Sequence, residues 1–282
     1  MKFRRTLGLT AIAMIAFAAN SLLCRAALRR LTIDAASFSS IRIVSGAVAL
    51  CLILSIRNRH SSLTGSWLSA AALFAYVALF SFAYNTLPAA TGALLLFAAV
   101  QATMIVWGFC AGERLSSRQW LGFLIASAGL VLLLLPGLSA PSIAGSLLML
   151  SAGFAWGIYS VRGRTSGDAT SATAGNFVRA VPVTLLLSVA FLRQAHVDLT
   201  GAGYAILSGA ITSGLGYIIW YAALPGLTST TAATVQLSAP VLAAIGGILL
   251  LSEPITIRFF ISAVAVLGGI ALVILEKHQQ KC

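Results

Sequence analysis

The chain is built from two copies of one block of about 140 residues. At an offset of 140, polar and glycine positions recur: Thr91 as Thr231, Glu113 as Glu253, Arg118 as Arg258 and Gly129 as Gly269. At an offset of 137, a second set pairs Phe17 with Phe154, Arg25 with Arg162, Arg42 with Arg179 and Tyr84 with Tyr221. Both glutamates directly follow a long apolar run, and both arginines of the first set open the next one. We therefore predict two repeats, 1–137 and 138–282.

The repeats are too apolar for a water-soluble fold. Hydrophobic residues make up 59% of the chain and charged residues 9%, whereas soluble domains are about 45–50% apolar and about 25% charged. The chain is therefore predicted to be an integral membrane protein with the lipid bilayer as its partner. The net charge of +12 is attributed to basic loops that set topology rather than to nucleic-acid binding.

Ten apolar runs approach the ~20 residues that cross a bilayer as a helix. They cover 7–28, 35–56, 65–86, 89–111, 117–136, 142–161, 172–193, 203–222, 228–251 and 256–275. The first run resembles a signal peptide, but it aligns with an internal segment through Phe17 and Phe154, so we interpret it as a retained helix. Five helices per repeat is an odd number, so the two repeats must be inverted relative to each other.

The distribution of Lys and Arg outside these runs predicts the orientation. With the N-terminus inside, the inner segments hold 11 and the outer segments 5. The positive-inside rule therefore places both termini in the cytoplasm, in a multi-pass protein of the cell (inner) membrane. The main exception is an outer cluster of Arg25, Arg29 and Arg30.

Several residues predict where helices begin, bend or end. Ser116 followed three residues later by Gln119 predicts a capping box, and Thr256 holds the matching position in the second repeat. Pro182 and Pro240 fall inside runs, where proline should kink or break a helix. Glu113 and Glu253 end helices and are interpreted as structural turn residues.

The repeat motifs carry a family resemblance. They are Ala111-Gly112-Glu113-Arg114-Leu115 with Gly122 and Gly129, and Ser238-Ala239-Pro240 through Leu251-Ser252-Glu253-Pro254 with Gly268-Gly269. With two inverted five-helix repeats, the whole chain resembles the drug/metabolite transporter superfamily, and within it the EamA-type permeases. One departure is that Pro240 has no counterpart in the first repeat, which has Val100 and Gln101. The resemblance implies export or exchange of small metabolites, often amino acids, through a central cavity.

Arg42 and Arg179 are the ionisable residues that lie deepest in the runs. Each lies about seven residues into its run, and ionisable groups at membrane depth are expensive and usually functional. Arg42 shares a helix face with Ser39 and Ser45, and Arg179 shares one with Asn176. One interpretation places an arginine near each mouth of the pathway, where a guanidinium suits a carboxylate or phosphate. The alternative is that both reach headgroups or bind helix-end carbonyls.

Further polar and aromatic residues at depth are candidates for the cavity wall. Gln101 lies near the centre of its run, where an unpaired amide is costly. Aromatic walls with a few polar contacts are typical of small-molecule sites. The remaining candidates are Asn20, Trp156, Tyr159, Ser213, Tyr217, Trp220 and Gln236.

Other functions lack the residues they need. No Asp or Glu lies deep in a run, which disfavours organic cations as substrates and proton coupling through a central acid. Neither a metal-ligand spacing nor the paired aspartates or His-Glu-x-x-His of membrane enzymes occurs, so we expect no metal, no cofactor and no enzyme activity. We expect efflux of a small-molecule substrate, most readily an amino acid or related zwitterionic or anionic compound, by alternating access. A broader permease for anionic or sugar-linked metabolites, or a channel or facilitator, is the alternative.

Overall fold

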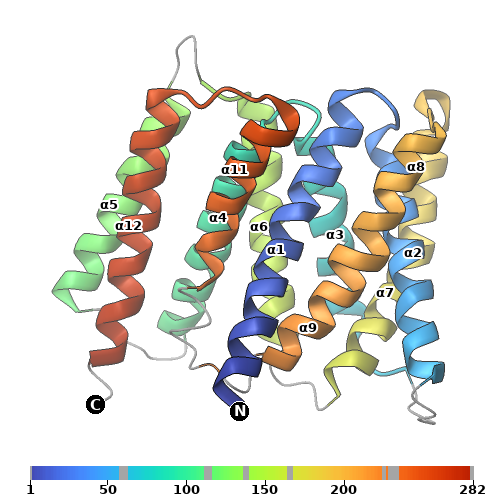
Figure 1. The fold of residues 1–282 in the computed structure, drawn as a ribbon, viewed down its shortest axis with the longest axis horizontal. Coiled ribbons are helices and arrows are strands. Elements are labelled where there is room, and N and C mark those ends of the chain that lie inside the picture. Colours follow the sequence, from blue (N-terminus) through green and yellow to red (C-terminus); the bar gives the residue numbers. More distant parts are fainter. Residues whose placement is uncertain are drawn as a thin grey trace.

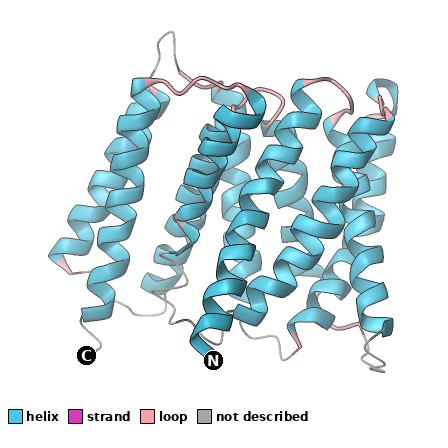
Figure 2. Ribbon diagram, in the orientation of Figure 1, coloured by secondary structure: helices cyan, strands magenta, loops and turns pink. Residues whose placement is uncertain are grey.

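The computed structural model describes residues 2–56, 63–110, 116–135, 140–163, 168–223, 227 and 235–279. Every regular element in these ranges is helical (Figure 2). The helices are α1 (Lys2–Arg29), α2 (Ala35–Ile56), α3 (Trp67–Ala83), α4 (Ala89–Cys110), α5 (Ser117–Leu134), α6 (Ile143–Gly163), α7 (Ala169–Ala190), η1 (Leu192–Gln194), α8 (Leu199–Ile206), η2 (Leu207–Leu215), α9 (Gly216–Ala223), α11 (Ser238–Leu251) and α12 (Ile257–Gln279).

The described helices confirm an all-α protein and have the character of membrane spans. Seven segments are long and apolar enough to cross a bilayer, and one of them is the continuous run Leu199–Ala223 formed by α8, η2 and α9. Three shorter apolar helices cover Trp67–Ala83, Ser238–Leu251 and Ile257–Leu272. Large apolar side chains such as Leu186, Leu249 and Leu250 are exposed, as contact with lipid requires. That all ten apolar runs cross the membrane as helices remains a prediction.

The helix ends follow the local sequence in most places. The Ser116 hydroxyl accepts from the backbone N–H of Gln119, whose side chain in turn accepts from the Ser116 N–H, which confirms the capping box. Thr256 accepts from the N–H of Phe259 at the start of α12. Pro182 was expected to kink or break its helix, yet α7 is continuous across it. Pro240 lies in the first turn of α11, where its missing N–H needs no partner.

The helices pack in a pattern that repeats between the two halves of the chain. α1 packs on the α8–η2–α9 span and on α11, and α6 packs in the same way on α3 and α4. α2 contacts α7, α4 contacts α11, and α5 contacts α12. The α5–α12 pair stands at one edge of the bundle (Figure 1). Close contact depends on small residues, since a Cβ at Gly153 would lie 2.5 Å from the Leu96 carbonyl oxygen.

Hydrogen bonds at the helix ends fix the relative directions of the helices. Arg25 near the end of α1 binds the carbonyl of Tyr84 at the end of α3. Arg162 at the end of α6 instead binds the Ser66 and Ser69 hydroxyls at the start of α3. α1 and α6 therefore run in opposite directions, and α1 begins at the end of the bundle where α12 ends (Figure 1).

Candidate functional site

Arg42 lies in the interior of the bundle, where its guanidinium is held on two sides. Its side chain is 0% exposed. Nε donates to the Ser213 hydroxyl over 3.1 Å, and Nη2 donates to the Tyr76 hydroxyl over 3.1 Å. The guanidinium carbon lies 5.1 Å from the ring centroids of both Tyr76 and Phe80, within cation–π range. Nη1 is buried and has no hydrogen-bond partner in the part of the chain that the structure describes.

The charge of Arg42 has no acidic partner among the described side chains. The ion pair found there joins Arg25 to Glu253, and Asp34, Asp168 and Asp198 each cap the start of a helix. Burying a cation without a compensating negative charge costs a protein several kcal/mol of stability. The charge of the Arg42 guanidinium is therefore not neutralised by the described side chains.

A second polar network meets Arg42 at the Tyr76 hydroxyl. Asn20 of α1 accepts from the Ser208 hydroxyl over 2.6 Å and from the Thr212 hydroxyl over 3.2 Å. Its amide nitrogen then donates to the Tyr76 hydroxyl oxygen over 3.3 Å. Because that oxygen accepts from both Asn20 and Arg42, the Tyr76 O–H proton is left to donate elsewhere. The network therefore presents donors and needs an acceptor.

A small aromatic cavity of about 20 Å³ adjoins this network; Asn20 and Tyr76 line it, and Arg42 meets it through Tyr76. The Trp156 ring lies 4.8 Å from Tyr217 and 4.9 Å from Tyr76, and Phe17 packs edge-on against Trp156. The Tyr217 hydroxyl is buried beside Ser213. The lining residues are Phe17, Asn20, Ser21, Tyr76, Phe80, Leu96, Phe97, Trp156, Thr212 and Tyr217.

The other predicted lining residues fall around this centre or away from it. Tyr159 stacks on Trp156 at 5.5 Å, and Trp220 meets Phe17 edge-on at 5.9 Å. Gln101 is buried on α4, and its Nε2 has no partner in the described chain, but it does not line the aromatic cavity. Gln236 is buried just before α11.

Arg179 and Asn176 lie elsewhere, against the segment that leads into α3. Arg179 is partly buried, and its Nη1 donates to the carbonyl oxygens of Thr64 over 2.6 Å and Gly175 over 2.9 Å. The Asn176 side-chain oxygen accepts from the Ser66 N–H over 3.0 Å. These contacts correspond to the alternative in which an arginine binds backbone carbonyls, and they tie α7 to the start of α3.

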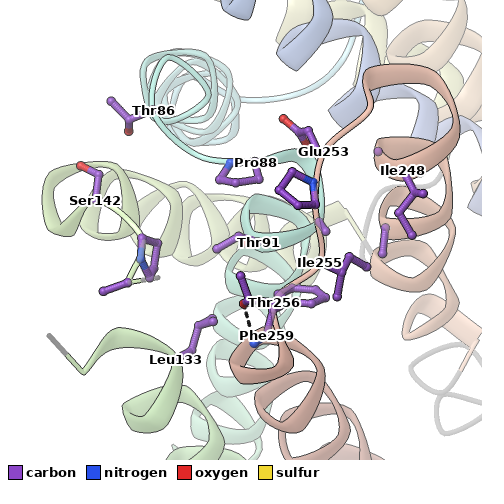
Figure 3. A pocket seen from close by; sticks show the side chains of 16 residues that line it. Thr86, Pro88, Thr91, Leu133, Ser142, Ile248, Glu253, Ile255, Thr256 and Phe259 are labelled. Carbon is purple, nitrogen blue, oxygen red and sulfur yellow. Dashed lines mark hydrogen bonds between the residues drawn. The ribbon is translucent and has the colours of Figure 1, made fainter. Parts of the chain in front are cut away.

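Glu253 lies at the other end of the bundle, where α1 and α3 end. Its carboxylate accepts from Arg25 Nε over 2.8 Å and from the N–H of Ala89, at the start of α4, over 2.7 Å. It also lines an outer pocket in which Pro88 and Thr91 face Leu133 and Phe259 of the α5–α12 pair (Figure 3). The capping contact agrees with the interpretation of Glu253 as a structural turn residue. Its repeat mate Glu113 lies outside the described residues.

Sequence reasoning missed several residues that build the centre, among them Phe17, Phe80, Tyr76, Ser208 and Thr212. Tyr76 carried a usable signal, because it lies near the centre of the apolar run 65–86. Ser208, Thr212 and Ser213 form a hydroxyl cluster that only the fold brings to Asn20 and Arg42.

A bundle of apolar helices around a buried polar centre is typical of a multi-pass membrane protein. The model of the EamA-like transporter family matches residues 5–135 and again residues 143–275. The chain belongs to this family, and it is accordingly a membrane transporter of the drug/metabolite superfamily and not an enzyme.

Three relatives match three quarters or more of the chain. A Pseudomonas aeruginosa protein, named uncharacterized protein PA1977, is 55% identical over 97% of this chain and 96% of its own length. An uncharacterized transporter of Archaeoglobus fulgidus is 28% identical over 75% and 77% of the two chains. The uncharacterized transporter YoaV of Bacillus subtilis is 22% identical over 83% and 85%. A solved crystal structure shares the fold, with a TM-score of 0.67 at 17% identity over 98% of both chains.

Proposed function

We propose that the protein exports small metabolites that carry an anionic group, amino acids or related zwitterionic or anionic compounds, across the inner membrane. The observation that carries this proposal is the buried Arg42. Among the described residues Arg42 has no acidic partner, and its Nη1 has no hydrogen-bond partner. A carboxylate or phosphate would accept these hydrogens and neutralise the charge. The aromatic rings beside it suit an apolar or planar body in the substrate.

Alternating access between two inverted repeats, 1–137 and 138–282, is the proposed mechanism. Three findings support it: the two separate family matches, the repeated packing pattern and the opposite directions of α1 and α6. The centre draws on both repeats, because Asn20, Arg42 and Tyr76 meet Ser213 and Tyr217 across it. Rocking of one repeat against the other would expose this centre to each side in turn.

In the proposed conformation the pathway is closed at both ends of the bundle. At one end Arg25 joins α1 to the ends of α3 and α11. At the other end Arg162 and Arg179 join α6 and α7 to the start of α3. α1 begins and α12 ends at this second end of the bundle (Figure 1), and the excess of Lys and Arg in the inner segments supports a cytoplasmic location for it.

Three compounds with one phenyl skeleton test the charge requirement: phenylpropionate carries a carboxylate, phenethylamine an ammonium, and phenylalanine both. We expect the protein in liposomes to transport phenylpropionate and phenylalanine and to exclude phenethylamine. The Arg42→Ala variant should no longer transport phenylpropionate or phenylalanine, the two compounds that carry a carboxylate. Transport of phenethylamine alone, or equal transport of all three, would refute the proposal. Parallel panels of labelled amino acids and nucleotide sugars distinguish an amino-acid exporter from a permease for sugar-linked anions.

A further inference from the structure

The span that contributes Ser213 contains an unusual helical segment. Between α8 and α9, the nine residues Leu207–Leu215 form a π-helix, in which backbone hydrogen bonds join residues five apart. π-Helices are rare, usually last a single turn and concentrate at functional sites. The segment contacts α2 closely, since a Cβ at Gly209 would lie 2.1 Å from the Arg42 carbonyl oxygen.

The π-helix brings three hydroxyls to one side. Ser208 and Thr212 reach Asn20 on α1, and Ser213 reaches Arg42 on α2. In an α-helix, with about 3.6 residues per turn, Ser213 would lie roughly 140° around the axis from Ser208. The wider π turn keeps positions four and five residues apart on the same face. The backbone form of this segment therefore decides whether Ser213 meets Arg42.

The matching segment of the first repeat is a regular α-helix. At the offset of 137, Leu207–Leu215 corresponds to 70–78 in α3, and Ser213 corresponds to Tyr76. Arg42 is thus held by two repeat mates, Tyr76 on Nη2 and Ser213 on Nε. With two of its three nitrogens held, the plane of the guanidinium is fixed and Nη1 is left for a ligand.

We propose that the π-helix Leu207–Leu215 exists to place Ser213 as a positioning residue for Arg42, and so sets the specificity of the site for an anion. This inference rests on the proposed function. Ser213 does not itself need to touch the substrate. Its hydroxyl holds the guanidinium so that Nη1 faces an incoming carboxylate, and preorganisation of this kind adds affinity for the anion alone.

Binding of phenylpropionate and phenethylamine to the purified protein in nanodiscs tests the role of Ser213. Ser213→Ala should weaken phenylpropionate binding about tenfold without changing the weak binding of phenethylamine. Ser213→Thr should retain the wild-type affinity, because it keeps the hydroxyl. Unchanged phenylpropionate affinity in Ser213→Ala overturns the inference. If wild-type protein does not prefer phenylpropionate to phenethylamine, the proposed function itself fails, and the inference fails with it.

A pair of deletions tests the role of the π backbone. A π turn holds one residue more than an α-helix needs, so deleting Gly214, which follows Ser213, should leave a folded protein with a regular span. Ser213 would then lie about 140° around the axis from Ser208 and face away from Arg42. This variant should show the same tenfold loss as Ser213→Ala, and combining the two changes should add no further loss. The control deletes Ile211 instead: the span again becomes regular, but Ser213 follows Ser208 by four residues, stays on the same face about 40° away, and should keep the wild-type affinity. Failure of the Gly214 deletion to fold, its normal binding of phenylpropionate, or an equal loss in the Ile211 deletion overturns the proposed role of the π-helix.

Discussion

Arg42 and Arg179 occupy the same position in the two repeats but bind different kinds of group. Arg42 is fully buried and donates to two side chains, the hydroxyls of Ser213 and Tyr76. Arg179 is partly buried and donates to two backbone carbonyls, those of Thr64 and Gly175. Duplication supplied two equivalent cations. The surroundings of Arg42 leave its Nη1 without a partner among the described residues, whereas Arg179 is paired with backbone carbonyls.

The difference arises from the residues that face each arginine. Around Arg42, α3 supplies Tyr76 and Phe80, and the π-helix supplies Ser213, so only side chains reach the guanidinium. Arg179 instead lies beside Thr64, where the chain leads into α3 and exposes a carbonyl. Carbonyls at helix ends and in connecting segments are permanent acceptors, so an arginine there needs no ligand to be satisfied.

Removing each side chain should separate the two roles most clearly. Arg42→Ala should lower transport of phenylpropionate per folded molecule by tenfold to a hundredfold, about 1.4–2.8 kcal/mol, because the cation that would bind the carboxylate is lost. Arg179→Ala should leave this rate within about twofold of wild type. Liposome transport, normalised to the amount of folded protein, measures both. Equal losses in the two variants would restore the interpretation in which both arginines bind substrate.

Thermal unfolding should rank the two sites in the opposite order. Arg42→Met replaces an uncompensated buried charge by an apolar chain of similar length and should stabilise the protein by about 1 kcal/mol. Arg179→Met removes two hydrogen bonds to carbonyls and should destabilise it by about 1–2 kcal/mol. The comparison uses unfolding midpoints of both variants in one detergent without ligand. A stability loss in Arg42→Met as large as that in Arg179→Met would show that Arg42 has a structural role.

Hydropathy predicted much of this fold but not the difference between the arginines. The run 35–56 coincides with α2, and 89–111 with α4, because crossing a membrane imposes a long apolar run that is legible in the sequence. Arg42 donates hydrogen bonds to Tyr76 and Ser213, which lie 34 and 171 positions away in the sequence. Its surroundings therefore exist only in the folded chain. The π-helix was also missed. It contains no proline, and its glycines resemble ordinary packing glycines of other spans.

Lysine substitutions should produce a smaller but more specific contrast. Arg179 uses one nitrogen, Nη1, for both carbonyl bonds, and a lysine ammonium can replace a single cationic donor. Arg42 uses Nε and Nη2 and leaves Nη1 free, and an ammonium cannot reproduce that planar arrangement. Arg179→Lys should therefore keep both stability and transport. Arg42→Lys should transport phenylpropionate several-fold more slowly than wild type, about 1 kcal/mol, but faster than Arg42→Ala. Full activity in Arg42→Lys would mean that charge alone is sufficient.

The smallest expected contrast lies at the caps of the two helices that carry these arginines. Asp34 opens α2 and accepts from the N–H groups of Ala36, Ser37 and His196. Asp168 opens α7 and accepts from the N–H of Thr170. Because Asp34 also ties α2 to the segment before α8, we expect Asp34→Ala to cost about 1 kcal/mol, more than Asp168→Ala. Equal costs for the two variants would show that the His196 contact adds no stability.

Acid should weaken the same cap of α2. Burial alone would raise the pKa of the Asp34 carboxyl, but hydrogen bonds from Ser37, His196 and Ala36 together hold that pKa below its ordinary value of 3.8. A lowered pKa in the folded state means that the stabilisation is fully present above the ordinary value and is lost as the pH falls through the folded one. His196 binds through its backbone N–H, so titration of its ring does not break this bond. Unfolding midpoints of wild type and Asp34→Ala should therefore differ at neutral pH and converge in strong acid. A constant difference across the whole range would contradict the assignment of the contact to the ionised carboxylate.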